Sequence, residues 1–184
     1  MAAEILLSSE SFVKSVTSVS DNLSGKYILP SLREAQEIGL RNILGDGLLA
    51  KLKELVKDRA IGEESNTMYR ELLDRCQYYL AYVTIVEVTN KTTFKIGNFG
   101  VSKSSDENMQ IATQDEVAKM QYYYQSKADA CCLDLQNWLI ENRTSFPELN
   151  DNDCRRISSN LYSAASCGIF LGGVRGKGKR GCRR

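Results

Sequence analysis

The chain has 184 residues, 42% hydrophobic and 26% charged, which is ordinary for one globular domain with a buried core. Its formal net charge of +1 is unevenly divided: residues 1–154 hold 16 Lys/Arg against 23 Asp/Glu, a net −7, whereas residues 155–184 hold eight basic and no acidic side chains. Histidine is absent, which removes the usual general base and the usual partner of a nucleophilic Ser or Cys.

The sequence carries no recognisable catalytic or metal-binding motif. It has no glycine-rich phosphate loop and no Cys-x-x-Cys pair among its six cysteines, although zinc sites usually need such pairs. We therefore expect no enzymatic activity, no catalytic residue, no cofactor and no metal. No apolar stretch approaches the length of a membrane span, and the N-terminus lacks the features of a signal peptide. We expect synthesis in the cytoplasm and no membrane contact.

Capping residues and prolines indicate the first helices. Serines that can cap exposed amides predict a short helix over residues 8–16, followed by a polar loop over residues 18–26. The next helix is predicted to begin at Pro30, which suits a first turn. It should end at Gly45, with Asp46 as the N-cap of the following helix.

Two more helices are expected before the middle of the chain. Leu48, Leu49, Leu52, Leu55 and Val56 repeat on one helical face. Asn66 can cap a long helix that keeps apolar residues at helical spacing to about Glu87.

An alternating stretch after these helices predicts a β-hairpin at about residues 91–104, with Gly97-Asn98 as its turn. A lone two-stranded hairpin is only marginally stable in water. We therefore expect Phe94 and Ile96 to contact a neighbouring subunit or a tail protein.

The strongest predicted element is the helix after Thr113, which forms a capping box with Glu116. The run Tyr122-Tyr-Tyr124 must place at least one ring on another face, available for a subunit contact. Phe146-Pro147 should close this region, and a last helix is expected over residues 151–167. The predicted core-facing stripe consists of Val117, Met120, Tyr124, Ala128, Cys131, Leu135 and Trp138.

These elements predict a mainly α fold: a helical bundle with one β-hairpin insertion and an extended basic C-terminal tail. The helical domain should span residues 1–167 and the tail residues 168–184. We expect the tail to contact a partner protein or nucleic acid through Phe170, Arg175, Lys177, Lys179, Arg180, Arg183 and Arg184.

The order of elements resembles the head–tail connector proteins (head-completion or adaptor proteins) of tailed bacteriophages, particularly those of crAss-like phages. The resemblance is carried by Ile5-Leu-Leu-Ser-Ser-Glu-Ser-Phe-Val-Lys14 and by Ile28-Leu-Pro-Ser-Leu-Arg-Glu-Ala-Gln-Glu-Ile-Gly-Leu-Arg-Asn-Ile-Leu-Gly45. The helix that ends in Ile-Leu-Gly before Leu48-Leu-Ala-Lys-Leu is its most telling part. It covers roughly residues 4–143 as an element order.

The resemblance implies a structural virion protein located in the phage neck. Copies would form a homo-oligomeric ring, typically twelve-fold in this family, that joins the portal protein to tail and neck proteins. Viral DNA would pass through the lumen of the ring. The alternative from the residues alone is a small nucleic-acid-binding accessory protein that acts through its basic tail.

Overall fold

The structure is a computed structural model in which residues 5–97, 100–103 and 113–149 are described. They form a mainly helical bundle, which confirms the predicted fold class at this level. The helices are α1 (Glu10–Val16), α2 (Gly25–Glu34), the π-helix η1 (Ala35–Leu40), α3 (Arg41–Lys57), α4 (Thr67–Thr93) and α5 (Gln114–Glu141). Short 3₁₀ turns are η2 (Ala60–Gly62), η3 (Glu64–Asn66) and η4 (Arg143–Ser145), and the strands are β1 (Phe94–Gly97) and β2 (Gly100–Lys103).

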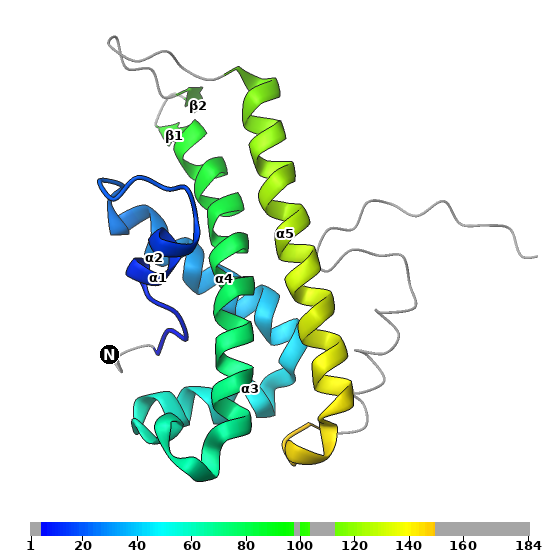
Figure 1. Cartoon of the computed structure of the whole chain (residues 1–184). Coiled ribbons are helices and arrows are strands. Elements are labelled where there is room, and N and C mark those ends of the chain that lie inside the picture. The colour runs from blue at the N-terminus through cyan, green and yellow to red at the C-terminus, as the bar shows by residue number, and fades with distance from the viewer. Residues whose placement is uncertain (1–4, 98–99, 104–112, 150–184) are drawn as a thin grey trace, which may run out of the picture.

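The two longest helices, α4 and α5, run antiparallel and side by side, and α4 occupies the centre of the molecule (Figure 1). Helices α1 and α2 pack on the flank of α4 opposite α5, and α3 lies behind the pair in this view. The strands β1 and β2 lie at the end of the pair where α4 finishes and α5 begins. We call this the hairpin end, and the opposite end of the pair the closed end.

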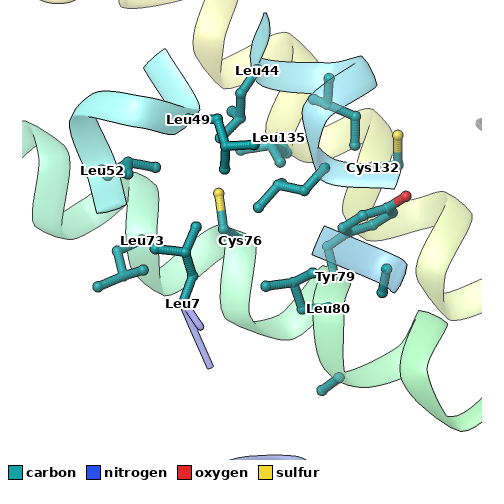
Figure 2. Close-up of a cluster of buried hydrophobic side chains, with 14 of the residues drawn as sticks. Leu7, Leu44, Leu49, Leu52, Leu73, Cys76, Tyr79, Leu80, Cys132 and Leu135 are labelled. Carbon is teal, nitrogen blue, oxygen red and sulfur yellow. The ribbon is translucent and has the colours of Figure 1, made fainter. Parts of the chain in front are cut away.

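The core is aliphatic and draws on every long helix. Figure 2 shows leucines of α3, α4 and α5 around the buried Cys76, together with Leu7 from the segment before α1. Burying a leucine side chain stabilises the fold by about 1.5–3 kcal/mol. The predicted repeat after Gly45 is confirmed, because Leu48, Leu49, Leu52 and Leu55 are all buried.

Helix α2 begins earlier than the sequence predicts. Ser24 caps it by accepting a hydrogen bond from the Lys26 amide, so the helix starts at Gly25 and Pro30 lies in the second turn rather than the first. The π-helix η1 follows. Its wider turn interrupts the helical period, so Ala35 and Leu40 are buried while Ile38 is 66% exposed.

A buried glutamine in η1 fixes the N-terminal segment, and no sequence pattern pointed to it. The Leu7 amide donates to Gln36 Oε1 at 2.8 Å, and Gln36 Nε2 donates to the Ile5 carbonyl at 3.0 Å. Gln77 Nε2 in α4 donates to the Leu7 carbonyl at 3.0 Å. These bonds satisfy backbone groups that would be costly to bury unpaired.

The break at Gly45 is confirmed, because its φ of 80° and ψ of 167° lie in a backbone region that residues with a Cβ rarely adopt. The predicted cap at Asp46 is wrong, because Asp46 is exposed and its carboxylate lies 3.3 Å from Arg41 Nε. The predicted start of the next long helix is confirmed, because α4 begins at Thr67, directly after Asn66, and it continues past Glu87 to Thr93. The Asn66 side-chain amide donates to the Ala60 carbonyl.

Helix α5 begins with the predicted capping box, in which Thr113 and Glu116 cap each other's amides. Its buried side is shifted from the predicted stripe: Tyr124, Ala128 and Leu135 are buried, but Met120 is exposed and Cys131 and Trp138 are only partly buried. The remaining core positions are Cys132, Gln136 and Leu139.

Strands β1 and β2 pair antiparallel, with Phe94 opposite Lys103 and Ile96 opposite Val101. Of the predicted Gly97-Asn98 turn, Gly97 is the last residue of β1, and Asn98 lies outside the described residues. The last predicted helix and the tail 168–184 also lie outside them.

Candidate interaction surfaces

A groove lies between α4 and α5 on the described surface. Its volume is about 580 Å³, and most of its lining is apolar. The seven residues that line it are Glu71, Asp74, Arg75 and Tyr78 from α4 and Ala130, Cys131 and Asp134 from α5. We refer to this feature as the α4–α5 groove.

Only some of the charged side chains that line the groove form ion pairs. Arg75 forms an ion pair with Asp134 and stacks over the Trp138 ring, 5.2 Å from its centroid. Glu71 and Asp74 are exposed, and neither forms an ion pair with another residue of the described chain. The rim of the groove therefore offers two carboxylates to a basic partner.

The end of the groove nearer the hairpin is apolar. Tyr78 is exposed, and its ring meets Phe12 of α1 edge-on with centroids 5.5 Å apart. Opposite it, Cys131 is a half-buried free thiol. Burial, and then the negative charge of Asp134, raise the pKa of Cys131, so the thiol stays protonated near neutral pH and behaves as an apolar group.

An aromatic cluster extends this surface toward the hairpin end. The Lys127 ammonium lies 4.6 Å from the Tyr123 ring centroid and 5.4 Å from that of Tyr82. Tyr82 also stacks on the buried Tyr124 at 6.4 Å. The Tyr122-Tyr-Tyr124 run thus divides as the sequence predicts: Tyr124 is buried, while Tyr122 and Tyr123 are exposed.

Large apolar side chains are also exposed on both outer flanks of the molecule. On the α5 flank these are Tyr122, 77% exposed, and Leu133, which lie on nearly the same side of the helix because eleven residues make about three turns. On the opposite flank they are Leu29 in α2 and Ile38 in η1. We call these the α5 flank and the α2 flank.

The residues predicted to make contacts from sequence are placed only in part. Phe94 and Ile96 lie in β1 at the hairpin end. The tail residues Phe170, Arg175, Lys177, Lys179, Arg180, Arg183 and Arg184 lie outside the described residues. Sequence reasoning missed the α4–α5 groove, because its lining comes from two helices about 60 positions apart in the chain.

Two further findings concern metal binding and membrane spans among the described residues. Among residues 5–97, 100–103 and 113–149, no group of three His, Cys, Asp or Glu side chains is arranged to hold a metal ion. In the same ranges, no helix combines the length and the hydropathy that crossing a bilayer requires.

One comparison identifies the family of this chain. The model of a family of unknown function, DUF6712, matches residues 40–159, well over half of the sequence. The chain therefore belongs to this family. No curated protein and no solved structure matches it.

Proposed function

We propose that this chain is a structural ring subunit of the neck of a tailed bacteriophage, joining the portal to the tail and continuing the DNA channel. The resemblance in element order over residues 4–143 suggests this class. The acidic balance of residues 1–154 suits a channel wall that repels DNA and lets it slide. The basic tail and the hairpin would contact the portal, neighbouring copies or tail proteins.

The observation that carries the proposal is the presence of exposed apolar residues on two different flanks. A closed ring with more than two members needs a head-to-tail interface, in which each copy presents two different surfaces. Tyr122 and Leu133 belong to α5, and Leu29 and Ile38 belong to α2 and the π-helix η1 that follows it; α5 and α2 lie on opposite sides of α4 (Figure 1). We propose that the α5 flank of one copy packs on the α2 flank of the next, in a ring of about twelve copies as in the resembling family.

The experiment uses two complementary variants of the full chain. Tyr122→Glu with Leu133→Glu disables the α5 flank, and Leu29→Glu with Ile38→Glu disables the α2 flank. Their masses are measured by native mass spectrometry and light scattering, with rings of the unmodified chain examined by electron microscopy, alone and with the portal protein of the same genome. Ala50→Glu, at an exposed position of α3, is the matched control.

The unmodified chain and Ala50→Glu should form rings, and each flank variant alone should stay monomeric. An equimolar mixture of the two flank variants should form a dimer and nothing larger, because one intact interface remains between them. Failure of the mixture to dimerise, or rings formed by either flank variant, would contradict the head-to-tail arrangement.

The charge division favours nucleic-acid binding as a second candidate function, because residues 175–184 carry six basic and no acidic side chains. A tail that contacts phosphates with all six should give a log–log salt dependence of DNA affinity with a slope of about −5. A chain that binds DNA with this slope and forms no rings would favour the accessory role over the neck ring.

A further inference from the structure

We infer that the α4–α5 groove is the docking site for the chain's own C-terminal segment, residues 168–184, from the same or a neighbouring copy. The proposed flank contacts do not use this groove. The inference specifies the surface that the basic tail contacts, and it holds whether or not the flanks form a ring. The segment reads Gly-Ile-Phe-Leu-Gly-Gly-Val followed by Arg-Gly-Lys-Gly-Lys-Arg-Gly-Cys-Arg-Arg. It combines an apolar start with a basic end.

Charge is the first ground for this assignment. The groove carries three carboxylates, and its single cation, Arg75, is already paired with Asp134. Glu71 and Asp74 remain exposed and without an ion pair among the described residues. The segment brings six positive charges and no negative one, which makes it the most basic stretch of the chain and complementary to this rim.

The apolar character of the groove is the second ground. Tyr78, Ala130 and the protonated Cys131 form the end of the groove nearer the hairpin, and a hollow of about 580 Å³ has room for a large side chain. Ile169, Phe170 and Leu171 precede the charges and are followed by glycines, so they have little of their own sequence to pack against. Phe170 against the Tyr78 ring would bury both aromatic surfaces.

The place where the described chain ends is the third ground. Glu148 accepts a hydrogen bond from the Tyr69 hydroxyl at 2.8 Å, so Leu149, the last described residue, lies near the start of α4, toward the Glu71 end of the groove. Residues 150–167 separate Leu149 from the segment, and such a length spans up to about 60 Å when extended. The segment therefore reaches its own groove or that of a neighbour.

The test measures binding of a labelled peptide to the full chain. The peptide covers residues 168–184 with Cys182→Ser and a fluorophore at its N-terminus, and binding is followed by anisotropy at low salt. The host chain carries Phe170→Ser, Arg175→Ser, Lys177→Ser, Lys179→Ser and Arg180→Ser, so that its own tail does not compete. The unmodified chain should bind the peptide more weakly than this host.

Three host variants identify the site. Glu71→Lys with Asp74→Lys should weaken binding by about tenfold or more, since each reversal replaces an attraction with a repulsion. Ala130→Trp should weaken it by filling the hollow without changing charge. Glu63→Lys with Glu64→Lys makes the same charge change at exposed positions away from the groove and should leave most of the affinity.

Circular dichroism and melting of each variant establish that the fold is retained. Equal weakening by both charge-reversed pairs would show a diffuse attraction to the acidic body and would overturn the inference. So would full affinity in Ala130→Trp, or no saturable binding to the host. Because the readout is peptide affinity and not ring formation, failure here leaves the flank experiment unaffected, and the reverse also holds.

Discussion

At the closed end of the α4–α5 pair, the segment that follows α5 packs back onto the two helices. Phe146 is fully buried, with its ring centroid 5.3 Å from that of Tyr69 and 5.6 Å from that of Trp138. The backbone also approaches closely there: a Cβ added to Gly47 would lie 3.1 Å from the carbonyl oxygen of Glu148. This end is a packed part of the core.

The hairpin end of the same pair is built differently. Met120, Tyr122 and Tyr123 are exposed within four positions of α5. Beyond the Tyr82–Tyr124 stack, the two helices are joined here by polar bonds such as that from Gln121 Nε2 to Asn90 Oδ1 at 2.6 Å. The comparison teaches that one helix pair separates two tasks: the closed end supplies stability, and the hairpin end keeps large side chains available for contacts.

Phe146→Ala should have the largest effect of any change considered for this comparison. Removing a buried aromatic ring costs about 3–5 kcal/mol of unfolding free energy, from lost burial and the cavity left behind. Urea denaturation measures it. Met120→Ala, at the exposed hairpin end, should change the free energy by less than about 0.5 kcal/mol. Similar costs at the two positions would refute the division of tasks.

Gly45→Ala should come next, with a loss of about 1–3 kcal/mol, because the backbone conformation at Gly45 is one that residues with a Cβ rarely adopt. Gly62→Ala is the matched control, since an added Cβ there meets no atom within 4 Å. Thermal unfolding of the two variants should separate clearly. Equal melting temperatures would mean that α3 relaxes around position 45 at little cost.

Tyr69→Phe should cost about 1 kcal/mol, through the lost hydrogen bond to Glu148. Burial, and then Glu148, raise the pKa of Tyr69 to about 12, above the value of about 10 in the unfolded chain. The folded state thus holds this proton more tightly. The resulting stabilisation is complete below about pH 10 and is lost as the pH rises toward 12.

Denaturation midpoints measured between pH 9 and 11.5 test this pH dependence. The unmodified chain should lose stability more steeply than Tyr69→Phe. Part of the slope should persist in the variant, because burial also raises the pKa of Tyr79 to about 12. Identical slopes would show that Tyr69 titrates as it does in the unfolded chain.

Tyr122→Ala with Tyr123→Ala should have the smallest effect on stability, within about 0.5 kcal/mol, because both rings are exposed in the single chain. Their loss should instead weaken self-association, which sedimentation velocity measures across a concentration series. A large drop in melting temperature of the isolated chain would show that these rings support the fold.

The sequence by itself determined the helical class, the break at Gly45, the Leu48–Leu55 face and the capping box at Thr113. These features depend on local spacing, on backbone conformation or on hydrogen bonds within one turn. The division of Tyr122, Tyr123 and Tyr124 between surface and core follows for the same reason, since adjacent helical positions cannot share a face.

Only the tertiary structure decided which side of η1 and of α5 became the core. Ile38 is exposed because the π-turn η1 rotates it away, and Met120 is exposed although it is part of the predicted stripe. Gln36 holds Ile5 and Leu7 across about thirty positions, and the α4–α5 groove joins Glu71 and Asp74 to Ala130 and Asp134. Such features depend on where helices cross, which the spacing of residues within one helix does not determine.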